Sequence, residues 1–290
     1  MNLVESIVQL AIGSLAESVK ITLIILAMMI VIELFVLKFK KRMISFVKKN
    51  RTINYIISSF FGIIPGCIGT FAMDSLYMTG LLSFGGITAV MIATSGDEAF
   101  IMLSMAAKGE IPWSIIIVLI SVLFFLGIFG AFLAEFIKKK TNMKFCTKCM
   151  IKYHKNEEFK IKHFLKEHLV NHILKKHISQ IFVWLFVAIF AISLLQEHVN
   201  LEFSGVNIFY ILLIASLIGI LPISGPNVFL VVMFSKGMIP FSILLANSII
   251  QDGHGLLPII GFSIEDAVKI KLFNFMFGIT VGSILLLAGI

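Results

Sequence analysis

Charged residues are scarce in this chain of 290 residues. Only 14% of its residues are charged, whereas a soluble domain carries about 25%. Its mean hydropathy is +1.03, and several apolar runs reach ~20 residues, the length that spans a hydrocarbon core of ~30 Å. The shortage of charge argues against a soluble enzyme, and the number of apolar runs argues against a soluble domain with one anchor. We therefore predict an all-α, polytopic membrane protein.

Other features are also missing. The three cysteines give no disulfide framework. No G-x-x-x-x-G-K-[ST] run is present, which argues against a nucleotide-driven pump. An intramembrane metal-dependent hydrolase that uses Asp252 and His254 is an alternative, but the chain lacks an H-E-x-x-H helix. We therefore predict that the protein is not an enzyme.

The basic residues are concentrated in two blocks. Seven of the 24 Lys and Arg lie in residues 38–52 and twelve lie in residues 138–178, where three Glu leave a net charge of +9. Cytoplasmic loops of membrane proteins are enriched in Lys and Arg. We therefore interpret both blocks as cytoplasmic loops of a cell-membrane protein, and not as a nucleic-acid site.

The direction in which each segment crosses the membrane follows from these basic blocks. A first span at 19–37 ends in one basic block, and the apolar segment at 112–137 ends in the other, so the number of crossings between them is even. Only three apolar segments lie there, so at least one must be broken, at Pro65-Gly66 or at residues 94–97. The second half begins on the opposite side. We predict a membrane repeat at 1–137, a loop at 138–178 and an inverted membrane repeat at 179–290, with about eight to ten membrane segments, some of them broken or re-entrant.

The two halves contain similar segments. Residues 62–103 and 219–260 align without gaps with eight identities, among them Pro65 with Pro222 and Gly96 with Gly253. Paired segments interrupted by Gly and Pro indicate the substrate site of a transporter, near the midplane between the repeats. The predicted helix breaks are at Pro65, Gly66, Gly96, Pro222, Gly225, Pro226 and Gly253.

Polar residues occupy the same position in both segments, as Thr94-Ser95-Gly96-Asp97-Glu98 and Gln251-Asp252-Gly253-His254-Gly255. A charged carboxylate at the bilayer centre costs several kcal/mol unless it faces a cavity or a partner. Carboxylate and amide oxygens with one imidazole suit Mn²⁺ or another first-row divalent ion. The alternative is a structural ion pair between His254 and Asp252 or Asp97. The candidate ion-pathway residues are Cys67, Ser95, Asp97, Glu98, Ser224, Asn227, Asn247, Gln251, Asp252 and His254.

The sequence leaves two alternatives for each of two residues in the first segment. Cys67 is either a small core residue or a soft ligand that faces the pathway. Asp74 follows the first break and is either solvated near the outer surface or buried.

The loop at 138–178 has its own candidate site. Cys146-x-x-Cys149 and the nearby histidines have spacing typical of zinc ligands, with His154, His168 and His172 as the leading candidates. The alternative is a basic amphipathic stretch on the inner membrane surface. Both roles are compatible in one loop that captures a metal ion and delivers it to the pore.

Three motifs resemble a known family, at Thr94-Ser95-x-Asp97-Glu98, Pro222-x-Ser224-Gly225-Pro226 and Gln251-Asp252-Gly253-His254-Gly255. The family consists of bacterial and archaeal heavy-metal exporters with ten membrane segments, labelled arsenic efflux proteins or manganese transporters. The resemblance covers nearly the whole chain. Two positions depart from it, because Gly96 is an insertion and Asn227 stands where the family has His.

These observations favour secondary active export of a divalent metal ion, with manganese as the leading candidate, by alternating access of two inverted repeats. The metal ion is the substrate and no cofactor is expected, and protons that move through Asp97, Glu98, Asp252 or His254 are the expected energy source. The alternative is efflux of arsenite or an organoarsenical, which requires soft thiolates, and only Cys67 lies in the membrane region. Besides the metal ion and protons, the lipid bilayer is the partner that we expect. The sequence does not predict an oligomeric state.

Overall fold

The computed structural model describes residues 5, 7–27, 50–78, 80–143, 145, 178–198, 207–222 and 224–290. Within these ranges the chain is helical and contains no β-strand, as the sequence predicts. The first helix is Ile7–Ala27. The others are α2 (Arg51–Gly62), α3 (Ile68–Met78), α4 (Phe84–Ala93), α5 (Glu98–Ala107), α6 (Trp113–Thr141), α8 (Ser179–His198), α9 (Ile208–Ile220), α10 (Gly225–Ser235), α11 (Phe241–Ile250), α12 (Leu256–Phe262) and α13 (Ile264–Leu287).

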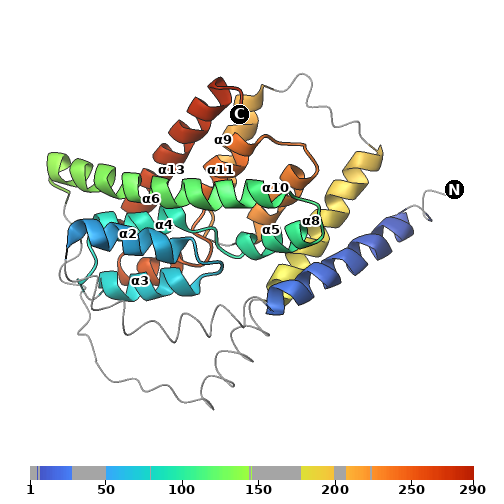
Figure 1. Cartoon of the computed structure of the whole chain (residues 1–290), viewed down its shortest axis with the longest axis horizontal. Helices are drawn as coiled ribbons and strands as arrows, with labels where there is room; N and C mark the ends of the chain where they lie inside the picture. The colour runs from blue at the N-terminus through green and yellow to red at the C-terminus, as the bar shows by residue number, and fades with distance from the viewer. Residues whose placement is uncertain are drawn as a thin grey trace, which may run out of the picture.

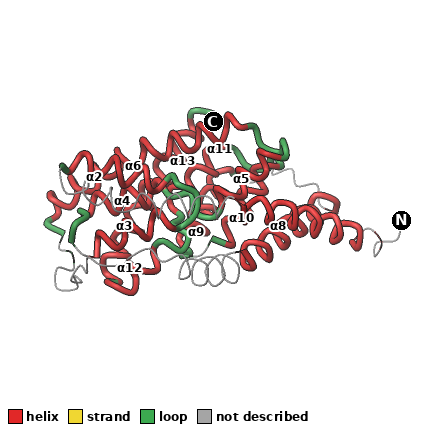
Figure 2. Tube along the Cα trace, turned by 60° about the horizontal axis from the view of Figure 1, so that its bottom comes forward, coloured by secondary structure: helices red, strands yellow, loops and turns green. Residues whose placement is uncertain are grey.

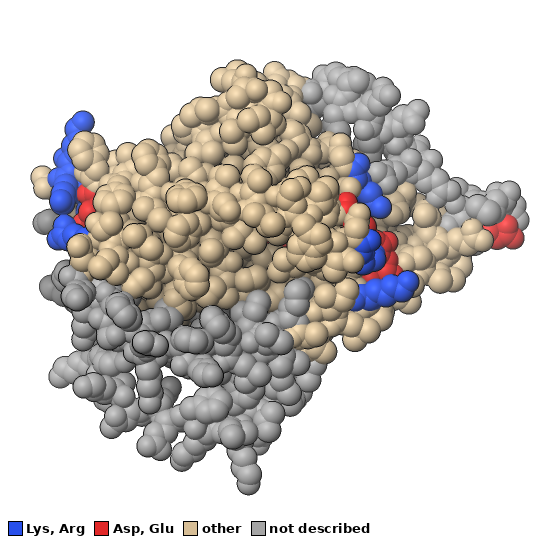
Figure 3. Space-filling view, in the orientation of Figure 1, with Lys and Arg blue, Asp and Glu red and all other residues tan. Residues whose placement is uncertain are grey.

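Four of these segments are long and apolar enough to cross a membrane: Ile7–Ala27, the broken segment Phe84–Ala107, α6 and α13. The 29 residues of α6 extend about 44 Å at 1.5 Å per residue. Large apolar side chains such as Phe125 and Phe136 are exposed on its outer face. Figure 3 shows the charged residues of the visible face gathered at two ends, with a band without charged side chains between them. Such a band is the surface that a bilayer covers.

Two sets of three helices form the centre of the molecule. In the first set α2, α4 and α6 pack against one another, and in the second set α9, α11 and α13 do the same (Figures 1 and 2). Helices α4 and α11 contact each other where the two sets meet. Three helices of the second half begin 157 residues after their counterparts in the first half: α9 after α2 at 208 and 51, α10 after α3 at 225 and 68, and α11 after α4 at 241 and 84.

Glycines allow this close packing. A Cβ on Gly127 of α6 would lie 2.8 Å from the backbone oxygen of Ala89 in α4, and a Cβ on Gly278 of α13 would lie 3.0 Å from that of Ala246 in α11. Small residues at helix interfaces let backbones approach closely in membranes. Every residue of α4 is buried, in keeping with its apolar sequence on all sides.

Four breaks interrupt the helices around this centre, at residues 63–67, 94–97, 221–222 with 224, and 251–255. They fall at the predicted Gly and Pro positions. Gly96 and Gly253 have φ values of 54° and 52°, a left-handed conformation that glycine adopts without steric cost. At the first break the chain doubles back, because α3 packs against α2. The first half of the chain therefore contains both a hairpin, α2–α3, and an interrupted span, α4–α5.

Candidate metal centre

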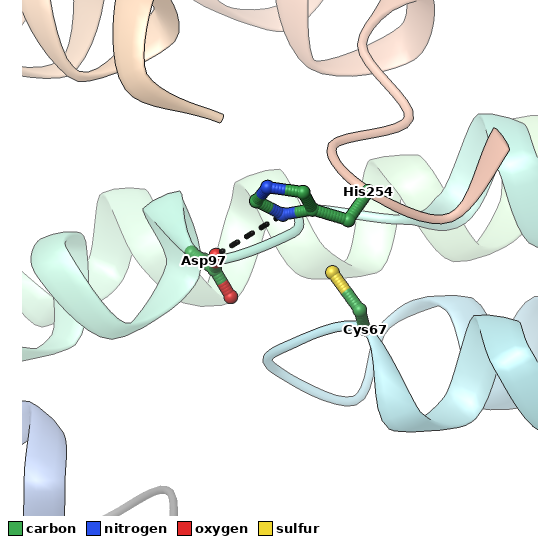
Figure 4. A group of neighbouring side chains, drawn as sticks. All are labelled: Cys67, Asp97 and His254. Carbon is green, nitrogen blue, oxygen red and sulfur yellow. Dashed lines mark ion pairs between the residues drawn. The ribbon is translucent and has the colours of Figure 1, made fainter. Parts of the chain in front are cut away.

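Three of the breaks bring one side chain each to a single place. Cys67 precedes α3, Asp97 precedes α5 and His254 precedes α12 (Figure 4). One ligand atom from each residue lies within 4.8 Å of the other two, and Nδ1 of His254 is 3.8 Å from Oδ2 of Asp97. Their exposed fractions are 5%, 2% and 7%. A thiol, a carboxylate and an imidazole therefore converge in the interior, and each of the three is a known ligand type for divalent transition metals.

The backbone of the breaks creates this convergence. The N–H group of Gly66 donates a hydrogen bond of 2.9 Å to the carbonyl oxygen of Gly96, which joins the first break to the second. A Cβ on Gly66 would lie 2.9 Å from the Phe100 ring, and a Cβ on Gly96 would lie 2.5 Å from Oε2 of Glu98. The positive φ therefore favours glycine at both positions, and at Gly66 the Phe100 ring leaves little space for a side chain.

Residues of the second half contribute to the site from positions equivalent to those of the first half. Gln251 lies 157 residues after Thr94, and its side-chain amide donates to the Thr94 carbonyl oxygen at 3.2 Å. Asp97 and His254 are related by the same offset, as are Cys67 and Ser224. The hydroxyl groups of Thr70 and Thr94 are hydrogen-bonded at 2.7 Å. The candidate centre is thus built from matching positions of the two similar segments.

Further polar side chains surround the three candidate ligands. Asn247 donates to Oδ1 of Asn227 at 2.9 Å and to the carbonyl oxygen of Ala215 at 3.0 Å, while the Asn227 side chain lies beside the Glu98 carboxylate. A Cβ on Gly253 would lie 3.0 Å from Ser224 Oγ and 3.8 Å from Cys67 Sγ. These contacts place Ser224, Asn227 and Glu98 in the neighbourhood of the centre.

Several buried oxygens near the centre lack a hydrogen-bond partner among the residues that the structure describes. They are Ser95 Oγ, Ser224 Oγ and Gln251 Oε1. An unsatisfied buried polar group costs roughly 1–3 kcal/mol. A cation with its water molecules is one partner that would remove this cost.

Asp252 has a different environment from the one the sequence suggests. Its carboxylate forms an ion pair with Lys271 of α13, and Asn274 donates to its other oxygen at 3.2 Å. Lys271 also donates to the carbonyl oxygen of Ile250 at 2.7 Å. Of the two ion pairs that the sequence leaves open for His254, the structure therefore contains the one with Asp97.

Lys271 and Asn274 were not identified from the sequence, although a signal was present. Together with Gly278 and Gly282 they lie at helical spacing i, i+3, i+7 and i+11, on one face of α13. Glycine on a membrane helix favours packing against a neighbour, so this pattern indicates that the lysine faces the protein interior.

The buried interior contains more negative than positive groups. Five carboxyl side chains are buried among the described residues, and the buried groups that can offset them are Lys271 and His254. Buried charges are normally paired or coordinate a metal ion. The five carboxyl residues, Asp74, Asp97, Glu98, Asp252 and Asp266, have exposed fractions of 3% or less. This imbalance favours bound protons, a positively charged ligand, or both.

The remaining predicted positions divide into two groups. Gly225 and Pro226 begin α10, and Pro222 lies in the break before it, as predicted. The zinc candidates Cys146, Cys149, His154, His168 and His172 lie outside the described residues.

One comparison with known proteins gives a match. A family model described as "Putative, 10TM heavy-metal exporter" matches residues 6–209 and 163–287 of the chain. No curated protein and no solved structure matches it. The family match and the apolar helices together support a multi-pass membrane location.

Proposed function

We propose, since the chain belongs to this family of ten-transmembrane heavy-metal exporters, that it exports a divalent first-row metal ion by secondary active transport. The observation that carries the proposal is the convergence of Cys67, Asp97 and His254 at three helix breaks, inside a buried region with an excess of carboxylates. The substrate would replace its water shell with these side chains and with nearby amide and hydroxyl oxygens.

Manganese is the leading substrate. The oxygens of Asp97, Glu98, Ser224 and Gln251 outnumber the single imidazole and the single thiol near the centre, and oxygen ligands suit Mn²⁺. Cys67 adds a soft ligand, which favours Zn²⁺ in comparison with an all-oxygen site. Mn²⁺ and Zn²⁺ are therefore the two ions between which a measurement must discriminate.

Arsenite or an organoarsenical is the second candidate. The location of Cys67 at the centre supports it, because arsenic(III) prefers thiolates. The described part of the chain contains one cysteine, however, so a single thiol would have to bind a strongly thiophilic substrate. The oxygen-rich surroundings favour a metal cation over arsenic.

Alternating access of two inverted repeats is the proposed mechanism. Matching helix starts, matching breaks and the pairing of Asp97 with His254 across equivalent positions support it. In transporters of this kind the substrate site lies between the repeats, and one repeat moves against the other. Movement at the α4–α11 contact would expose the centre first to one side of the membrane and then to the other.

Flux into proteoliposomes tests the proposal. The purified protein would be reconstituted and offered Mn²⁺, Zn²⁺, Cd²⁺ and arsenite in turn. We expect saturable flux of Mn²⁺, and a loss of at least tenfold in Asp97→Asn and His254→Ala. Glu265→Gln, which alters an exposed carboxylate at the start of α13, serves as the control with normal flux. Flux of arsenite alone would favour the second candidate, and no flux of any of the four would refute export of these substrates.

A further inference from the structure

Asp74 of α3 is a buried carboxyl group that the candidate metal centre does not use. It is 0% exposed, and neither of its oxygens has a hydrogen-bond partner within the described parts of the chain. Met73, Leu76, Ile87 and Met91 belong to the apolar cluster of this region. A charged carboxylate without a partner is unstable in such surroundings, so the group requires a proton or a compensating charge.

The position of Asp74 links the candidate metal centre to one end of the molecule. Thr70 precedes it by one helical turn on the same face and is hydrogen-bonded to Thr94 at the second break. Tyr77 follows it by almost one turn and donates a hydrogen bond of 3.0 Å to Asp266 of α13. At a rise of 1.5 Å per residue, Asp74 lies about 10 Å from Cys67 along the axis of α3.

The Tyr77–Asp266 pair lies toward the basic end of α6. Asp266 is in the first turn of α13, and Lys269, one turn later, lies 5.0 Å from the centre of the Phe145 ring. Lys138, in the last turn of α6, lies 4.9 Å from the centre of the same ring. Polar groups therefore lead from the neighbourhood of Asp74 to the end of the molecule where Lys138 to Lys140 lie.

The other titratable groups around Asp74 are few. Asp252 and Cys67 are near enough to interact with it electrostatically, and Asp252 is itself paired with Lys271. Helices α4 and α12, which pack against α3, contain no titratable side chain. Helix α2, which also packs against α3, contains Arg51, which is exposed, and Tyr55, which lies against Phe132 of α6. No described cation is paired with Asp74, so a proton is the simplest species that neutralises it.

We propose that Asp74 carries the proton that is exchanged for the metal ion. When a divalent ion occupies the centre, its charge favours the Asp74 carboxylate, and the O–H bond breaks to release one proton toward Tyr77 and Asp266. After the metal ion leaves on the other side, the carboxylate takes up one proton and its charge is neutralised again. This inference rests on the proposed export function and adds the coupling residue to it.

The test separates exchange of metal ions from coupling to protons. In proteoliposomes, a pH gradient of one unit should change the steady-state ratio of Mn²⁺ across the membrane about tenfold for each coupled proton. Asp74→Asn should abolish this dependence on the gradient, and it should retain counterflow, in which labelled Mn²⁺ exchanges for unlabelled Mn²⁺ without net proton movement. Glu265→Gln should behave like the wild type in both assays.

Each other outcome has a defined meaning. Gradient-driven accumulation by Asp74→Asn would overturn the inference and leave the export function intact. Absence of both accumulation and counterflow in the wild type would refute manganese export itself, and the inference with it. If Asp74→Asn is inactive in counterflow, Asp74→Glu decides: gradient-driven accumulation by this variant supports the role of a protonatable group, and its absence overturns it.

Discussion

The ion pair between Asp252 and Lys271 gives a quantitative prediction. Lys271 is 8% exposed and Asp252 is 1% exposed, so the pair is effectively in the interior. Removal of one partner of a buried pair leaves an uncompensated charge and typically costs about 3–5 kcal/mol. Lys271→Met, which keeps much of the side-chain volume, should therefore lower the free energy of unfolding by about that amount.

The lost hydrogen bond from Lys271 to the Ile250 carbonyl oxygen adds roughly 1 kcal/mol. The double variant Lys271→Met/Asp252→Asn removes both charges, and replacement of a buried pair by neutral groups is often close to neutral. We expect the double variant to be more stable than Lys271→Met, even though it contains one more substitution.

The assay is thermal unfolding in detergent micelles for the wild type, both single variants and the double variant. The Lys271→Met midpoint should fall by on the order of 10 °C, and the double variant should recover most of this loss. A double variant no more stable than Lys271→Met would show that the pair is not the source of the stability and would refute the reasoning.

Two further predictions concern the centre itself. Cys67→Ser replaces a soft sulfur ligand by oxygen, so competition assays should show Zn²⁺ inhibition of Mn²⁺ flux weakened several-fold while Mn²⁺ flux itself persists; stronger Zn²⁺ inhibition would contradict a role for the thiol. Gly96→Ala forces a Cβ to within 2.5 Å of Glu98 at a positive φ, so flux should fall at least tenfold. Gly109→Ala is the matched control, because its φ is 79° but no atom lies within 4 Å of the added Cβ, and equal losses in both variants would show that backbone strain alone is responsible.

Helix breaks could be predicted from the sequence because they depend on local properties. Pro65 and Gly66 cannot continue a helix without cost, and the two similar segments contain Gly96 and Gly253 at equivalent positions. Polar residues beside such glycines in apolar sequence must face something other than lipid. These two rules place Asp97, Asp252 and His254 among the candidate residues, but they leave open whether His254 pairs with Asp97 or with Asp252.

The partners of these residues depend on packing between distant helices, which local patterns do not specify. The sequence does not say that Lys271, nineteen residues after Asp252, is its partner, because this depends on the rotation of α13 about its own axis. The sequence leaves the role of Cys67 open for the same reason, because its location at the centre requires the first break to approach the other two. Neither rule predicts the burial of Asp74, which depends on the packing of α3 against α4 and α12.

Binding of Co²⁺, followed by absorption spectroscopy, tests the central claim most directly. Co²⁺ reports on its ligands, because a bound thiolate produces a charge-transfer band and a change of geometry alters the visible d–d bands. If Cys67, Asp97 and His254 form one metal site, the wild type should bind Co²⁺ with a thiolate band. Cys67→Ser should lose the band, Asp97→Asn and His254→Ala should bind at least tenfold more weakly, and Glu265→Gln should match the wild type. Equal Co²⁺ affinity and equal spectra in all five proteins would contradict the account.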